Sequence, residues 1–149
     1  MQISDMQTPL SFDKWRRIFE ESFPPLDKYA SVYKDLHQHP ELPCQEYRTA
    51  AVVAGHLEAL GYQVQRDIGG HGVVGLLNNG PGKAVLLRSE LDALPIEEDT
   101  GLPYASKVEQ VDMDGYTKRV MHACGHDMHM ASLLGAADLL WKVRNAWSG

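Results

Sequence analysis

The chain has 149 residues, a net charge of −6 and 44% hydrophobic residues, which is an ordinary composition for a globular protein of one domain's size. The negative charge argues against nucleic acid as a partner, because phosphate binding needs a basic surface. No apolar run approaches a membrane span, and residues 1–11 lack the basic start and apolar core of a signal peptide, so we expect a cytoplasmic protein.

Three helices are predicted in the N-terminal half of the chain. The first covers residues 11–23, with Ser11 as its cap and a Pro-Pro pair as its stop. The second covers residues 26–38 and carries apolar residues at helical spacing. The third covers residues 46–60 and is followed by Gly61, a residue type that commonly ends helices.

The pattern then changes to the period of strands. Residues 62–66 alternate like a strand, and residues 73–77 and 84–87 are short apolar runs typical of buried strands. Residues 119–121 are predicted as a further short strand, and an amphipathic helix covers residues 127–147. Helices that precede strands, with another helix after them, predict a layered α/β domain.

The signature segment, residues 122–131, contains a thiol, three imidazoles and a carboxylate. Cys124 and His126 are two apart, which in an extended arm puts both side chains on one face. His126 and His129 are three apart, which does the same in a helix. A thiolate–imidazole mixture suits Zn, Fe, Co or Ni better than Ca or Mg, so the spacing favours a transition-metal site over coincidence.

Polar residues near the end of the second helix are open to more than one interpretation. His37, His39 and Glu41 lie where the helix dipole favours imidazolium, so capping is slightly preferred over a functional site. The nearby Cys44 is interpreted as a bystander, because two cysteines do not make a disulfide framework and a paired Cys124 would be unable to bind metal.

Acidic residues follow the apolar run at 84–87. Glu90 and Asp92 stand where α/β proteins build sites at strand ends, although a solvated loop fits these residues equally well. The acidic cluster at residues 97–99 is interpreted as solvated charge. The Asp-Gly pair at 114–115 predicts a surface hairpin turn rather than a calcium loop, since no later Glu stands at the required offset.

Taken together, these segments resemble the metallopeptidase M20 family, in the amidohydrolase branch that includes N-acyl-amino-acid, hippurate and auxin-conjugate hydrolases. The matching stretches keep their order and spacing: residues 36–41, 80–82, 88–95 and 121–131. The Cys-Gly-His-Asp-x-His signature is specific to this branch. The resemblance implies an N-terminal helical extension, residues 1–32, and the N-terminal part of a zinc-peptidase-like layered α/β catalytic domain, residues 33–149, with the family's lid or dimerisation domain absent.

The resemblance also implies a chemistry: hydrolysis of an amide bond in an N-acyl amino acid or similar small molecule, by water activated by a pair of divalent metals (Zn, Mn, Co or Ni). By motif, Cys124 and His126 are metal ligands, and Asp92 is a carboxylate that orients a ligand. Asp127 and His129 lie in the signature with undecided roles, and Glu90 stands where the branch commonly has Asp. A homo-oligomer is left open.

In the family, a Glu pair follows the helix that ends this chain, and its first member is the general base. The resemblance therefore implies that the general base lies beyond Gly149, that the chain is truncated, and that it is inactive alone. Two alternatives remain open. One is a short non-catalytic protein that binds a metal or a partner and covers its sheet edge, for instance by oligomerisation. The other is a thiol enzyme in which His126 or His129 activates Cys124.

Overall fold

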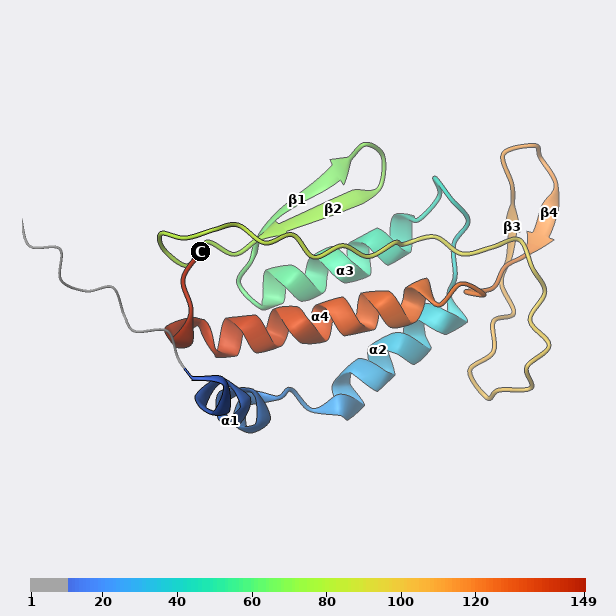
Figure 1. Cartoon of the computed structure of the whole chain (residues 1–149). Helices are drawn as coiled ribbons and strands as arrows, with labels where there is room; N and C mark the ends of the chain where they lie inside the picture. Colours follow the sequence, from blue (N-terminus) through green and yellow to red (C-terminus); the bar gives the residue numbers. More distant parts are fainter. Residues whose placement is uncertain (1–10) are drawn as a thin grey trace, which may run out of the picture.

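A computed structural model describes residues 11–149 as mixed helix and strand, with three helices packed side by side (Figure 1). The helices are α1 (Phe12–Ser22), α2 (Leu26–Gln38), α3 (Tyr47–Ala59), α4 (His126–Lys142) and the short 3-10 helix η1 (Arg144–Ala146). The strands are β1 (Gln63–Ile68), β2 (Gly72–Leu76), β3 (Glu109–Val111) and β4 (Thr117–Arg119). The predicted α/β class is confirmed.

Local chemistry explains where the first helices begin and end. Ser11 caps α1, because its Oγ accepts the backbone N–H of Lys14 at 3.4 Å. At the end of α3, Gly61 has a φ of 90°, and its N–H donates to the carbonyl of Glu58 while the next N–H donates to that of Leu57. This pair of bonds is a Schellman motif, so Gly61 ends α3 as predicted.

The start of α3 is capped from a distance. The carboxylate of Glu41 accepts the backbone N–H groups of Arg48 at 2.9 Å and Thr49 at 2.7 Å. These N–H groups belong to the first turn of α3, where no partner exists within the helix. Glu41 therefore serves α3, although the sequence places it at the end of α2.

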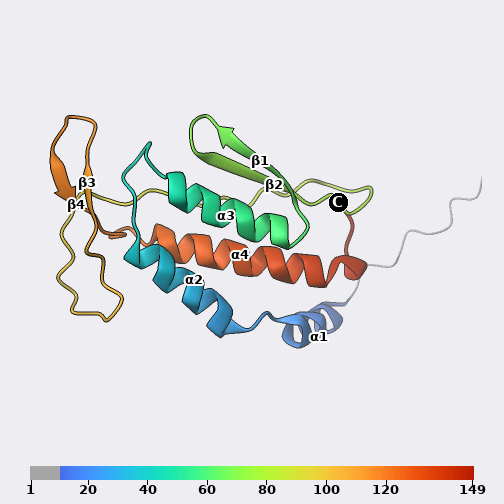
Figure 2. The ribbon, with the colours of Figure 1, turned by 180° about the vertical axis from the view of Figure 1, so that it is seen from behind.

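The main core lies between α2, α3 and α4, which run side by side in both views of the chain (Figures 1 and 2). Leu36 of α2 and Leu134 of α4 have no exposed surface, and Val53 and Leu57 contribute from α3. Burial of these apolar side chains is the main stabilising contribution of the fold. The remaining buried members of this core are Tyr29, Val32, Met130 and Ala137.

The sheets differ from the prediction in pairing and burial. Each is a two-stranded antiparallel hairpin, β1 with β2 and β3 with β4. The strand predicted at residues 73–77 is present as β2, but Val74 is 46% and Leu76 is 56% exposed, so its predicted burial is wrong. The hairpin turn predicted at 114–115 is confirmed between β3 and β4.

The predicted strand at residues 84–87 is wrong for the chain as described, because that segment is assigned no strand. Val85 is 84% and Leu86 is 87% exposed. A strand needs a neighbour to accept its backbone hydrogen bonds, and none pairs with this segment among residues 11–149. The segment instead runs extended past α3 (Figure 1).

The last helix is shorter than predicted. α4 ends at Lys142 rather than at residue 147, and η1 follows it. Asn79 holds this end of the chain, since its side-chain amide donates to the carbonyls of Arg144 at 2.7 Å and Trp147 at 2.6 Å. In the part of the chain that the structure describes, none of the helices combines the length and the apolar character that crossing a membrane requires.

A buried carboxylate connects α4 to α2. Asp138 is 4% exposed, and its Oδ2 accepts hydrogen bonds from the Tyr29 hydroxyl at 2.7 Å and from Lys28 Nζ at 3.1 Å. Burial alone would raise the pKa of Asp138, but these hydrogen bonds and the neighbouring lysines outweigh burial and hold the pKa below its ordinary value.

We expect Asp138→Asn to lower the free energy of unfolding by about 1–3 kcal/mol at neutral pH, because a charge-assisted hydrogen bond is lost. A depressed pKa in the folded state means that the contribution of Asp138 is complete above the unfolded pKa of about 3.9 and is lost as the pH falls through the lower folded pKa. Urea unfolding of both proteins should therefore give a constant difference at neutral pH that shrinks only below about pH 4. The exposed Asp114→Asn is the control. A difference that persists unchanged into strong acid would contradict this assignment.

Candidate metal centre

A short antiparallel bridge positions the signature segment. Leu94 N–H donates to the carbonyl of Met121 at 2.9 Å, and Met121 N–H donates to that of Leu94 at 3.0 Å. Gly125 then takes a left-handed φ of 78°, and α4 begins at the next residue, His126. The predicted helix is present, but the extended arm is wrong for Cys124, because the chain turns at residues 123–124 and His126 is already the first residue of α4.

The bridge brings Asp92 against His126. The Nδ1 of His126 lies 2.9 Å from the backbone carbonyl of Asp92 and 3.2 Å from its carboxylate Oδ1. Both acceptors favour the tautomer with the proton on Nδ1, which leaves the lone pair of Nε2 free. Metal-binding histidines in proteins are commonly oriented in this way by a carbonyl or carboxylate on the other ring nitrogen.

The thiol and imidazole groups of this region fit a transition metal by donor type. Cys124 is exposed and unpaired, and the rings of His126 and His129 lie 5.8 Å apart between centroids. Within residues 11–149, however, no group of three or more His, Cys, Asp and Glu side chains is arranged to hold a metal ion. The described residues thus offer donors without forming a closed coordination shell.

Glu90 contacts the other signature histidine. Its Oε2 lies 3.4 Å from Nδ1 of His129, and its Oε1 lies 2.8 Å from Nη1 of Arg88. The hydrogen bond with His129, together with the positive charge of Arg88, holds the pKa of Glu90 below its ordinary value. The side chain of His129 is 58% exposed, so this contact is weak and leaves the ring accessible.

The side chain of Asp127 is buried in the protein. Its Oδ2 lies 2.6 Å from Nδ1 of His37, whose Nε2 lies 3.1 Å from Oε1 of Glu98. All three side chains are at most 5% exposed. Burial alone would lower the pKa of His37, but the two carboxylates outweigh burial and raise it, as expected for an imidazolium that donates from both nitrogens.

Two interpretations of these residues from the sequence were wrong. His37 does not cap α2, because its ring contacts Asp127 instead. The histidine that contacts the last turn of α2 is His39, whose Nδ1 lies 2.7 Å from the carbonyl of Asp35. Glu98 is not solvated: it is 7% exposed and also accepts the N–H of Ser106 at 2.6 Å. The acidic residues on either side, at 97 and 99, are exposed. The sequence of the cluster therefore does not distinguish the buried Glu98 from its exposed neighbours.

His122 is a site residue that the sequence did not single out from the other histidines. It is 4% exposed, and neither ring nitrogen has a hydrogen-bond partner among the described residues. Burial away from water is the main reason that the pKa of His122 is lowered, so the ring is neutral at neutral pH. A buried imidazole without a hydrogen-bond partner lowers the free energy of unfolding. The position of His122 therefore has no explanation in the stability of the described residues.

The signature segment and its surroundings match known proteins. The model of the peptidase family M20/M25/M40 matches residues 86–149. Thermostable carboxypeptidase 1 of Saccharolobus solfataricus is 44% identical over 83% of this chain, which matches 30% of that protein. The hippurate hydrolase of Campylobacter jejuni is 45% identical over 76% of this chain, which matches 27% of that protein. A Bacillus subtilis structure, described as a dinuclear metal-binding peptidase of the M20 family, aligns with a TM-score of 0.68 at 37% identity, over 79% of this chain and 31% of that one.

The chain is similar to proteins of the M20 peptidase family, and it matches an N-terminal portion of relatives that include named amidohydrolases. It spans about a third of the length of the relatives it matches. The resemblance inferred from the signature is thereby confirmed, whereas the roles of Cys124, His126, Asp92, Asp127 and His129 stay predictions.

Proposed function

We propose that the complete protein is a metal-dependent amidohydrolase that cleaves the amide bond of N-acyl amino acids or similar short amides. The observation that carries this proposal is the contact of His126 Nδ1 with Asp92, at 2.9 Å to the carbonyl and 3.2 Å to the carboxylate. It leaves Nε2 of His126 free, and the free thiol of Cys124 lies two residues earlier in the chain, so the two donor types expected of a transition-metal site are close in sequence.

In this proposal Cys124, as the thiolate, and His126, through Nε2, are the metal ligands supplied by the chain. Asp92 is a positioning residue that holds the His126 ring, and Asp127 holds the start of α4 through its buried contact with His37. Held there, a pair of divalent metals of the Zn, Mn, Co or Ni type would supply an activated water and a Lewis acid for the amide carbonyl. The general base and the remaining ligands are proposed to lie beyond Gly149, so no catalytic residue is assigned here.

The substrate class rests on the relatives. Among them, a Bacillus subtilis protein named N-acetyl-L-cysteine deacetylase is 43% identical over 79% of this chain, and another relative is named hippurate hydrolase. Both names refer to enzymes that act on small N-acyl amino acids.

We also propose that residues 1–32 are an extension and that residues 33–149 begin the catalytic domain, although α2 spans that boundary. The protein is further proposed to be cytoplasmic.

The metal-binding role of Cys124 is tested with cobalt(II) as the probe, because a thiolate bound to cobalt gives a charge-transfer absorption band. We expect weak binding by the chain, since it offers only a few donors, and a loss of affinity as the pH falls, since the thiolate must be deprotonated. Cys124→Ser should abolish the band. Cys44→Ser is the matched control and should leave the band unchanged.

In the same preparation we expect negligible hydrolysis of N-benzoylglycine, because no general base is assigned within the chain. A band that survives Cys124→Ser would remove the thiolate from the site. Metal-dependent hydrolysis by the pure chain would show that its catalytic residues are already present, contrary to the proposal. If metal binds and no catalysis appears even in a longer chain that includes the missing Glu pair, the alternative of a non-catalytic metal-binding protein gains support.

A further inference from the structure

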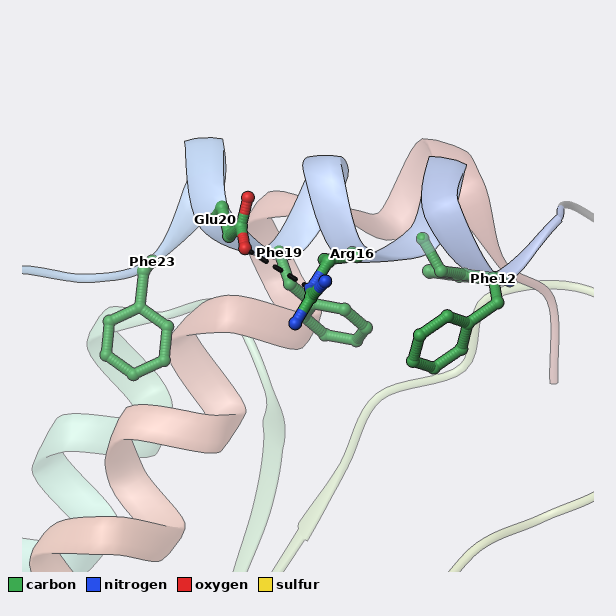
Figure 3. Close-up of a pocket in the computed structure, with 6 residues that line it drawn as sticks. Phe12, Arg16, Phe19, Glu20 and Phe23 are labelled. Atoms are coloured by element: carbon green, nitrogen blue, oxygen red, sulfur yellow. Dashed lines mark ion pairs between the residues drawn. The ribbon is translucent and has the colours of Figure 1, made fainter.

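Helix α1 carries an aromatic surface that the rest of the described chain does not cover. Phe12 is 79%, Phe19 39% and Phe23 58% exposed, and no residue of α1 is buried. With Trp15, Arg16 and Glu20, these side chains line an open groove of about 570 Å³ (Figure 3). An exposed apolar patch of this kind, with a polar rim, is typical of an interaction surface.

The groove lies along one face of α1 because of the helix periodicity. At about 100° per residue, Phe12, Phe19 and Phe23 fall on one face of α1. The half-buried residues of α1, which are Trp15, Ile18 and Ser22, fall on a neighbouring face. Phe12, Phe19 and Phe23 lie beside this half-buried face and stay exposed.

The rim of the groove is charged with both signs. Arg16 and Glu20 lie on the same side of the aromatic face, 3.5 Å apart and about two-thirds exposed (Figure 3). The aromatic residues extend from Phe12 to Phe23, so their midpoint lies between residues 17 and 18, and the midpoint of Arg16 and Glu20 is residue 18. The aromatic row and the charged rim thus share almost the same centre.

This shared centre makes the surface complementary to itself in one orientation. If a second copy of α1 lies antiparallel across the groove, a two-fold axis near residue 18 puts Phe12 opposite Phe23 of the other copy. The same axis puts Arg16 opposite Glu20 of the other copy, twice. In a parallel arrangement the two-fold axis runs along the helices and puts the charged rims on opposite sides of the interface, so these ion pairs would not form.

The charges of α1 also argue against a membrane surface. Helices that lie on anionic lipid have a basic polar face. The polar residues of α1 are balanced, with the cations Lys14, Arg16 and Arg17 against the anions Asp13, Glu20 and Glu21. A helix without net charge gains no attraction from anionic lipid, whereas an antiparallel copy of itself offers charges of the opposite sign.

We propose that the α1 groove is a homodimer interface, in which α1 of a second copy of this chain packs antiparallel over Phe12, Phe19 and Phe23. A helix of this length covers less than the roughly 800 Å² per partner of a standard interface. The dimer is therefore weak and forms only as the concentration rises.

The test is sedimentation velocity of the full chain over a range of about 5–500 μM, where mass should rise from the monomer's 16.6 kDa toward twice that value. Arg16→Glu and Glu20→Arg, each alone, put like charges opposite one another and should raise the dissociation constant at least about tenfold. Mixing the two variants should restore association, because every facing pair is then opposite in sign.

The controls are Lys14→Glu and Glu21→Arg, which make the same charge changes on the far side of α1 and should leave the dissociation constant unchanged. Circular dichroism establishes that each variant is folded, and recovery on mixing cannot come from folding of a single chain. A chain that stays monomeric at the highest concentration would overturn the proposal, leaving another partner or another part of the protein as the occupant. A dimer unaffected by the rim variants would also overturn it.

Discussion

Replacing His37 by alanine is expected to lower the free energy of unfolding by about 3–5 kcal/mol, the cost of removing one partner from a buried ion pair. His37 lies between Asp127, which is 1% exposed, and Glu98, which is 7% exposed. Without the imidazolium, these buried carboxylates face each other with no positive charge between them. Domains of this kind are stable by only about 5–15 kcal/mol, so the variant is expected to be close to unfolding.

The measurement is urea unfolding at neutral pH, followed by circular dichroism. His39→Ala is the matched control, because it removes the same side chain from the same helix end, where His39 is about half exposed and hydrogen-bonds to Asp35. We expect the control to lose no more than about 1 kcal/mol. Equal losses for both variants would mean that His37 is only a helix cap and that Asp127 does not depend on it.

Replacing Leu134 by alanine is expected to cost about 3 kcal/mol or more of unfolding free energy. Leu134 is fully buried at the centre of α4, in the core shared with α2 and α3. Alanine would remove apolar surface and leave a cavity that three packed helices are unable to close completely. Because α4 begins at His126, loosening this core would also loosen the residues proposed to bind metal.

Chemical denaturation of the variant and of Met128→Ala provides the comparison. Met128 lies on the same helix but is 49% exposed, so its truncation should cost less than about 1 kcal/mol. The midpoint urea concentration should fall markedly for Leu134→Ala and little for Met128→Ala. Similar shifts for the two variants would mean that α4 is not packed into the core in solution as it is in this structure.

Local rules made the helices predictable from the sequence. Ser11 and Gly61 act through bonds to backbone groups within four residues of themselves, so their function as cap and stop can be inferred from position alone. The apolar spacing of α2, α3 and α4 likewise depends on each helix's own period. The signature segment was recognisable for a similar reason, because its donor atoms are gathered within a few residues of one another.

Contacts between distant residues were not predictable in this way. An apolar run such as 84–87 becomes a buried strand only if another strand pairs with it, and among the described residues none does. His37 and Glu98 are separated by 61 residues and meet only because the connection that carries Glu98, before β3, folds against the end of α2. No local pattern distinguishes Glu98 from its acidic neighbours at 97 and 99.

The helical elements, the family resemblance and the residue types proposed to bind metal follow from the sequence, because each depends on short-range spacing. The contact of Asp92 with His126, the contact of Asp127 with His37 and the exposure of the phenylalanines of α1 follow from the packed chain instead. These facts depend on how segments far apart in the chain pack together, and packing reflects the sum of many weak contacts that no single motif records.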